Sequence, residues 1–309
     1  MMVYGKLILT AFLWGGTFVA GRILSDGMGA FSAAFLRFLL ASICMLWIMH
    51  TRAGGLPALD LKGWIGVSLL GATGVFAYNA CFFTGLQTVP AGRAAAIVAI
   101  NPILITLLAA FFFKEKLTKR KCIGIILSVS GAITAISRGD PISLFTHGVS
   151  LGDVAIMGGV ASWVLYSLLG KRMMNSISPH AAITYSCITG TLMLLPFALH
   201  EGMANEFSGY TMTHFLCIVY LGVLGTVIGF TWFYEAINTI GASRSGVFIN
   251  FVPVTAIICG WLFLGESVSI SLLAGVTLVI SGVYLTNSTP AALRKPEEVK
   301  QLKEGYDEV

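Results

Sequence analysis

Ten apolar runs, each about as long as the hydrocarbon core of a lipid bilayer is thick, follow one another along this chain of 309 residues. They lie near residues 5–24, 31–49, 64–85, 91–113, 120–137, 151–170, 180–199, 213–234, 243–264 and 269–286. A run of about 20 apolar residues crosses this core as a helix, and backbone exposed to lipid must form its hydrogen bonds internally. The sequence therefore predicts an all-α membrane protein with about ten transmembrane helices.

The composition also indicates a surface that faces lipid. Only 11% of the residues are charged, against about 25% in a typical soluble protein. The six cysteines stand singly with no C-x-x-C pair, so the sequence predicts neither a metal site nor a disulfide framework. Phosphate-binding and dinucleotide-binding fingerprints do not occur in it, and we expect no cofactor.

The basic residues predict how the chain is oriented. Lysine and arginine gather in the segments on the N-terminal side of the membrane and in the C-terminal tail, whereas the opposite side holds only Arg22, Arg93 and Arg138. By the positive-inside rule, both termini are expected in the cytoplasm, with the chain in the inner membrane if its source is bacterial. The net charge of +5 follows from this asymmetry and requires no nucleic-acid partner.

The chain contains an internal repeat. A shift of 151 positions places Gly71 on Gly222, Gly74 on Gly225, Phe82 on Phe233, Arg93 on Arg244, Pro102 on Pro253, Glu115 on Glu266, Gly124 on Gly275 and Gly131 on Gly282. We therefore expect a first five-helix copy at 1–138, a second at 150–287 and a cytoplasmic tail at 288–309. Because five is odd, the second copy must enter the membrane from the opposite side, and inverted repeats of this kind enclose a midplane site in many transporters.

Short motifs in both halves resemble one known family. They are Trp14-Gly15-Gly16, Arg37-Phe38-Leu39-Leu40-Ala41, the segment from Lys114 to Thr118 after Pro102, and Leu264-Gly265-Glu266 after Pro253. In this order the chain, over about residues 5–286, resembles the EamA family of the drug/metabolite transporter superfamily. The resemblance implies a ten-helix carrier with a central cavity that moves metabolites such as amino acids, often outward. The seventh run lacks a counterpart of Arg37, so the two halves are expected to contribute unequally.

The repeat and the resemblance together predict a secondary transporter, and more specifically an exporter of small metabolites, with amino acids or aromatic and amphipathic compounds as cargo. The alternative is a polytopic membrane enzyme or sensor that acts on lipid-soluble small molecules. The sequence clusters no acid, base or metal ligands, which favours a carrier over an enzyme. The expected partners are a small-molecule substrate and the bilayer, and the sequence assigns no oligomeric state.

Arg37 is the sharpest candidate for binding cargo. It lies well inside the second apolar run, where a charge costs at least about 2.5 kcal/mol unless it faces a cavity or a partner. One interpretation is an anchor for a carboxylate or another anionic group of the cargo. The other is a side chain that extends to the outer lipid headgroups.

The other candidate substrate-binding residues are aromatic and amide side chains inside the apolar runs. They are Trp14, Tyr78, Asn79, Asn101, Trp163, Tyr166, Tyr185 and Asn250. Rings with few polar groups suit an aromatic or amphipathic ligand, whereas the alternative is ordinary packing between helices. Trp14 and Trp163 are favoured among the rings, because a shift of 149 positions places one on the other.

Two prolines mark expected helix kinks. Pro102 directly follows Asn101, and Pro253 lies three residues after Asn250. Proline frees a backbone carbonyl one turn earlier in a helix. These sites therefore either present backbone oxygens to cargo or form simple kinks that the amides stabilise.

Three glutamates are candidates for coupling transport to protons. Glu115 and Glu266 occupy matching ends of two runs, where contacts at a helix end or a hinge compete with a proton-coupling role. Glu235, near the inner end of the eighth run, is the other intramembrane carboxylate.

Overall fold

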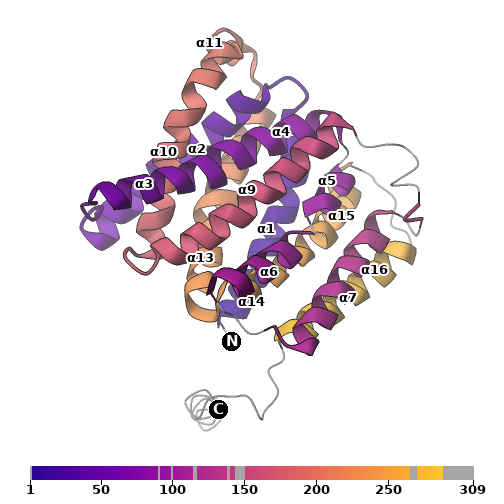
Figure 1. Ribbon diagram of the computed structural model, residues 1–309. Coiled ribbons are helices and arrows are strands. Elements are labelled where there is room, and N and C mark those ends of the chain that lie inside the picture. Colours follow the sequence, from indigo (N-terminus) through magenta and orange to yellow (C-terminus); the bar gives the residue numbers. More distant parts are fainter. Residues whose placement is uncertain are drawn as a thin grey trace.

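The computed structural model describes residues 2–89, 91–98, 100–113, 117–137, 140–142, 150–264 and 270–287, and all regular structure in these ranges is helical. The first half contains α1 (Met2–Leu24), α2 (Ala30–Ala53), α3 (Leu61–Leu70), the π-helix η1 (Gly71–Ala77), α4 (Tyr78–Thr88), α5 (Ala91–Val98), α6 (Asn101–Phe113) and α7 (Lys119–Ile136). The second half contains α9 (Leu151–Met173), α10 (Pro179–His200), α11 (Met203–Glu206), the 3₁₀ helix η2 (Phe207–Gly209), α12 (Met212–Val219), the π-helix η3 (Tyr220–Ile228), α13 (Gly229–Ile240), α14 (Ala242–Gly246), the 3₁₀ helix η4 (Val247–Asn250), α15 (Phe251–Leu264) and α16 (Ile270–Asn287). Figure 1 shows these helices packed side by side.

Seven helical segments in the described residues are long and apolar enough to cross a membrane. They are Met2–Leu24, Ala30–Thr51, Leu61–Thr88, Leu151–Met173, Pro179–His200, Met212–Ile240 and Ala242–Phe263. The other three expected ranges, 91–113, 120–137 and 269–286, carry shorter helices in their described parts. The structure thus agrees with a multi-pass α-helical membrane protein, and the count of ten transmembrane helices remains a prediction.

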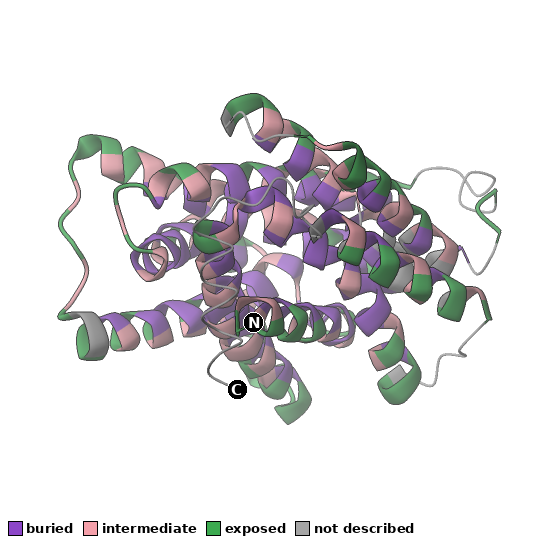
Figure 2. Cartoon of the chain, turned by 90° about the horizontal axis from the view of Figure 1, so that it is seen from below, coloured by how far each residue is buried: buried purple, intermediate pink, exposed green. Residues whose placement is uncertain are grey.

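Burial is arranged as a membrane protein requires. Figure 2 shows the buried residues gathered inside the bundle and the exposed ones on its outer faces. Many of those outer residues are large and apolar, such as Trp47, Phe111 and Leu262. In water such a surface would be costly, whereas in a bilayer these side chains face lipid tails of the same polarity.

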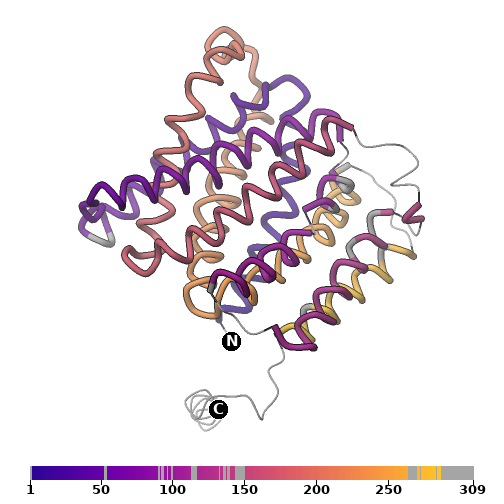
Figure 3. Tube along the Cα trace, in the orientation of Figure 1, coloured from indigo at the N-terminus to yellow at the C-terminus, as the bar shows by residue number. Residues whose placement is uncertain are grey.

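The close pair α7 and α16 shows how glycine lets two helices approach (Figure 3). A Cβ atom added to Gly124 would lie 2.6 Å from the carbonyl oxygen of Gly282, and one added to Gly131 would lie 2.6 Å from that of Gly275. The two helices therefore run antiparallel with backbones nearly touching, as small residues allow in membranes. The shift of 151 positions relates Gly124 to Gly275 and Gly131 to Gly282, so the repeat exchanges these two contacts.

Helix starts at related positions are built in the same way. Asp60 is the N-cap of α3 and accepts a hydrogen bond from the backbone N–H of Gly63, at 2.8 Å. Thr211, 151 positions later, is the N-cap of α12 and accepts one from the backbone N–H of His214. A side-chain oxygen at this position pairs an N–H group that the helix leaves unpaired.

The two π-helical segments were not expected from the sequence. Positions 71–77 of η1 correspond to 222–228 of η3 under the same shift. A π-helix pairs each N–H with the carbonyl five residues earlier, so carbonyl groups are left for other donors, and such segments are frequent at functional sites. Segment η1 packs on α10 and η3 packs on α2, so each contacts a helix of the other half.

Candidate functional site

A small cavity lies in the middle of the bundle. Its lining comes from both halves: Trp14, Thr17, Phe18, Arg37, Tyr78, Phe82, Val98, Asn101, Trp163, Phe230, Ile249 and Val252. It leaves about 30 Å³ for the centres of water molecules, which is room for about two waters. Ligand pockets usually enclose about 300–1,000 Å³. In this conformation the cavity is therefore too small for a metabolite.

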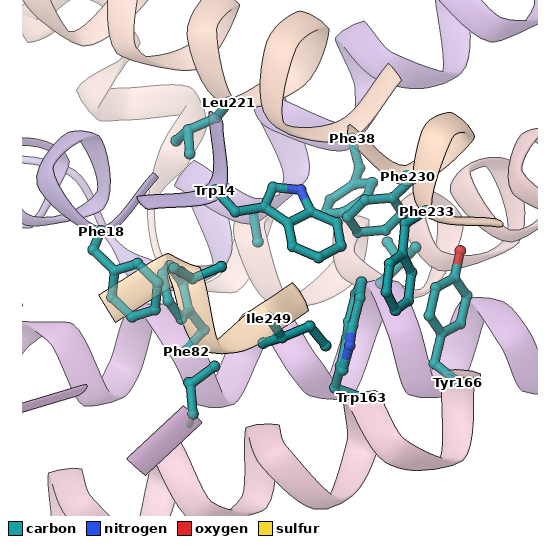
Figure 4. Close-up of a cluster of buried hydrophobic side chains, with 14 of the residues drawn as sticks. Trp14, Phe18, Phe38, Phe82, Trp163, Tyr166, Leu221, Phe230, Phe233 and Ile249 are labelled. Carbon is teal, nitrogen blue, oxygen red and sulfur yellow. The ribbon is translucent and has the colours of Figure 1, made fainter. Parts of the chain in front are cut away.

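Half of the residues in the cavity lining are aromatic, and Figure 4 shows aromatic rings gathered around Trp14 and Trp163. The two indoles meet edge to face, with centroids 5.2 Å apart and planes at 87°. Phe230 contacts both of them, at 6.0 and 5.2 Å. Tyr78 lies 5.2 Å from Trp163 on another side. Such pairs hold each ring in one orientation, so the cavity has a rigid apolar wall.

Arg37 brings a positive charge to this wall. Only 3% of the residue is exposed. Its Nε donates to the hydroxyl oxygen of Thr226 at 2.9 Å, and its Nη1 donates to the amide oxygen of Asn79 at 3.0 Å. The guanidinium is therefore enclosed by protein, and the alternative of an extension to the lipid headgroups is wrong.

Both partners of Arg37 are themselves fixed by the π-helical segments. The Asn79 amide nitrogen donates to the carbonyl oxygens of Gly74 and Val75 in η1, at 3.3 and 2.9 Å. The Thr226 hydroxyl donates to the carbonyl oxygen of Leu221 in η3, at 2.9 Å. Because their donors are engaged with backbone, both side chains turn an oxygen lone pair toward Arg37.

Asn101 is a polar residue of the cavity lining that is 1% exposed. Within the described part of the chain, neither its amide nitrogen nor its amide oxygen has a hydrogen-bond partner. Helix α5 ends three residues earlier, at Val98, and Asn101 itself begins α6. A buried amide without partners costs about 1–3 kcal/mol, so this group is available to a bound molecule.

Comparison with known proteins identifies the family. The sequence profile of the EamA-like transporter family matches residues 1–137 and 150–288. This chain belongs to that family.

Several relatives align with this EamA-like transporter over nearly its whole length. The uncharacterized transporter YyaM of Bacillus subtilis is 29% identical over 281 residues, which are 91% of this chain and 92% of YyaM. A probable terminal-alkyne amino-acid exporter of Streptantibioticus cattleyicolor is 29% identical, with 94% of each chain covered. A probable amino-acid metabolite efflux pump of Salmonella typhimurium is 25% identical, over 90% of this chain and 92% of that protein.

A solved structure has a similar fold. One chain in a crystal structure superposes with a TM-score of 0.73 and 18% identity, and the match covers 93% of the EamA-like chain and 97% of the other. At this identity the likeness concerns the fold alone.

The structure brings most of the expected residues of the EamA-like chain together, and places two of them elsewhere. Trp14, Arg37, Tyr78, Asn101 and Trp163 line the cavity. Behind this lining, Asn79 binds Arg37, and the ring of Tyr166 lies 5.3 Å from that of Trp163. By contrast, the Tyr185 hydroxyl donates to the carbonyl oxygen of Pro57 at 2.6 Å, and the Asn250 amide donates to Ser128 on α7 at 2.6 Å. These last two side chains lie outside the cavity lining, where Tyr185 binds the loop before α3 and Asn250 binds α7.

Beyond the expected site residues, the cavity is lined by Thr17, Phe18, Phe82, Val98, Phe230, Ile249 and Val252. Most are ordinary apolar residues of transmembrane helices, so nothing in their type marks them. Phe230 is different, since the shift of 151 positions places Asn79 on it. The repeat therefore pointed to Phe230, because its counterpart Asn79 was an expected site residue. The same shift places Val75 on Thr226, so the repeat did not point to that polar residue.

The backbone around both prolines departs from a continuous α-helix. Pro102 is the second residue of α6, directly after the interruption that follows α5. Pro253 is the third residue of α15, after the 3₁₀ turn of η4. Because proline lacks an N–H group, it cannot donate to the carbonyl one turn earlier. Before Pro253 that carbonyl belongs to Ile249, and the backbone N–H of Phe251 donates to it instead. Whether these sites serve cargo remains a prediction.

Of the three glutamates, only Glu235 lies within the described residues. Its carboxylate is 2.7 Å from the Lys6 ammonium and 3.7 Å from the His180 Nε2. This ion pair joins α13 to α1, with both side chains about one-third exposed. Glu115 and Glu266 lie outside the described residues. Among the residues that are described, no group of three His, Cys, Asp or Glu could hold a metal ion.

Proposed function

We propose that this protein is a secondary transporter, and in the cell an exporter, of small aromatic or amphipathic metabolites, including amino acids. The observation that carries the proposal is the central cavity, whose wall is centred on Trp14 from the first half and Trp163 from the second. A cavity enclosed by matching elements of two halves is the arrangement that alternating access uses. The names of two relatives, a probable terminal-alkyne amino-acid exporter and a probable amino-acid metabolite efflux pump, support the same cargo class.

Two inverted five-helix copies would supply the movement. The glycine contacts between α7 and α16, which the repeat exchanges, support a two-fold relation between the copies. The matching positions of η1 and η3 support it further. In this conformation the cavity has too little room for cargo, so one copy has to move against the other for a molecule to bind there. The ten transmembrane helices and the cytoplasmic location of both termini belong to the same proposal.

Transport by purified protein in liposomes tests the proposal. Vesicles are loaded with a panel of aromatic and aliphatic amino acids and aromatic amines, and the compounds released are identified chemically. We expect intact release of aromatic members. Trp14→Ala and Trp163→Ala should reduce the rate by about tenfold or more, because each removes a ring held by several aromatic contacts.

Trp47→Ala is the matched control, since Trp47 is 69% exposed on the outer face of α2 and should leave transport unchanged. Chemically altered products would instead support a membrane enzyme. Equal release from wild-type vesicles and from vesicles without protein would end the proposal for this cargo class.

A further inference from the structure

Arg37 carries a charge that the described part of the protein does not balance. The ion pairs recorded there join Glu235 to Lys6 and to His180, and no described carboxylate lies within 4.0 Å of the Arg37 guanidinium. Its two hydrogen-bond partners, Asn79 and Thr226, are neutral. Burying a cation without an anion is costly, and proteins compensate such charges by pairing them. The missing negative charge has to come from outside the described residues.

The guanidinium also has donors to spare. It presents five N–H groups in a planar fork, and the structure assigns one from Nε and one from Nη1. Its Nη2 passes beside Gly225, where an added Cβ would be 3.7 Å away. Because Arg37 is part of the cavity lining, the remaining N–H groups are within reach of a molecule held there.

The orientation of this fork depends on both halves of the chain. Asn79 is the second residue after the end of η1, and Thr226 lies within η3. Each holds its oxygen toward Arg37 because its own donor is bonded to a carbonyl of the π-helical segment. A guanidinium held at two points keeps its position when a ligand arrives, so less conformational entropy is lost on binding.

We infer that the cargo carries one carboxylate, which pairs with Arg37, and that Asn79 and Thr226 are the positioning residues for this contact. The inference rests on the proposed transport function and narrows its substrate class to monocarboxylates, zwitterionic amino acids included, with an apolar or aromatic group. A planar carboxylate matches the fork of a guanidinium in a bidentate pair. Among the described residues that line the cavity, Arg37 is the one cationic side chain, so this described lining balances a single negative charge.

The experiment compares ligands that differ only at the carboxylate. L-phenylalanine and 3-phenylpropionate are measured against L-phenylalaninamide and 3-phenylpropanamide. Binding is followed by tryptophan fluorescence of the purified protein, in which Trp14 and Trp163 line the cavity, and transport by release of the two amino-acid compounds from liposomes. For wild-type protein we expect each acid to bind at least about tenfold more tightly than its amide, because the guanidinium then pairs with a charged carboxylate instead of a neutral amide oxygen. Arg37→Gln should remove this preference.

Variants of Thr226 separate positioning from stability. Thr226→Val removes the oxygen that holds Nε, and we expect the KM for the acid to rise about fivefold or more while the KM for the amide and the maximal rates change little. Thr226→Ser should restore the acid preference. The matched control is Thr231→Val on α13, whose hydroxyl contacts the Met45 sulfur and not Arg37.

The outcomes are distinct. If wild-type protein binds and transports acid and amide equally well, the inference is wrong and the transport function stands. If Thr226→Val changes both ligands alike, Thr226 has a structural role and the positioning claim fails. If no member of the panel binds or moves, the proposed function fails, and the inference fails with it.

Discussion

The indole Nε1 of Trp14 donates a hydrogen bond of 2.8 Å to the carbonyl oxygen of Gly225. Gly225 lies inside the π-helical segment η3, where the wider hydrogen-bonding pattern leaves carbonyl groups for other donors. The bond therefore connects α1 of the first half to η3 of the second, and it fixes the ring that faces Trp163. The irregular backbone of η3 thus contributes directly to the shape of the cavity wall.

Replacing Trp14 by Phe tests this bond while keeping an aromatic ring. The variant leaves the Gly225 carbonyl without its indole donor, at a cost of about 1–3 kcal/mol. We expect a lower melting temperature and weaker binding of aromatic cargo, measured by thermal unfolding and by binding titration. Trp163→Phe is the control, because no hydrogen bond from the Trp163 indole is recorded in the described structure. Equal loss in both variants would show that ring size, and not the bond, is what matters.

Gly229→Ala tests how closely the start of α13 must approach α1. A Cβ at this position would lie 2.5 Å from Nε1 of Trp14, so the indole has to move. We expect transport to fall several-fold, with a stability loss of about 1–3 kcal/mol for overpacking. Gly5→Ala, on the same α1 helix as Trp14, meets nothing within 4 Å and should behave as wild type. Normal cargo affinity in Gly229→Ala would contradict the tight fit.

Gly131→Leu tests the pairing of α7 with α16. The new side chain has no room, because even a Cβ would be 2.6 Å from the Gly275 carbonyl oxygen. We expect the two helices to separate and the melting temperature to fall by several degrees, measured by thermal unfolding in detergent. The neighbouring Ser130→Leu is exposed and should have little effect. A Gly131→Leu variant as stable as wild type would show that this close approach is dispensable.

The ion pair of Lys6 and Glu235 joins α1 to α13 at the inner end expected from the charge pattern. With both side chains about one-third exposed, it should contribute less than about 1 kcal/mol to stability. If it helps to close that end, Glu235→Gln should raise the labelling rate of a cysteine at Thr10 severalfold without lowering the melting temperature. The exchange of both charges, Lys6→Glu with Glu235→Lys, should restore the original rate. An unchanged rate in Glu235→Gln would exclude a closing role.

Cysteine labelling from either side of the membrane tests the inverted repeat. Ala58 and Gly209 are exposed, precede α3 and α12 respectively, and are related by the shift of 151 positions. In a background without the native cysteines, a cysteine at Ala58 should react with an impermeant reagent only from the cytoplasmic side. A cysteine at Gly209 should react only from the outside. Reaction of both from the same side would disprove the inverted arrangement.

The lengths and composition of the apolar runs were enough to predict a helical, multi-pass membrane protein. The physical reason is local, since a chain in lipid must pair every backbone N–H and C=O within itself, and a helix of about 20 apolar residues does so without help from its neighbours. The motifs were also enough to indicate the family. Five of the expected site residues, among them Arg37 and Asn101, line the cavity.

Only the tertiary structure decided which polar and aromatic side chains share that cavity. Tyr166 and Tyr185 look alike in the sequence, yet the ring of the first packs at a tilt against Trp163 and the hydroxyl of the second binds a loop carbonyl at Pro57. Arg37 finds Thr226 across 189 positions of chain. Such contacts depend on how separate helices rotate and approach one another, and the helical period of one segment holds no information about its neighbours. The π-helical segments were not anticipated for a related reason, because partners from other helices, such as the Trp14 indole, pair the carbonyls that a π-helix leaves open.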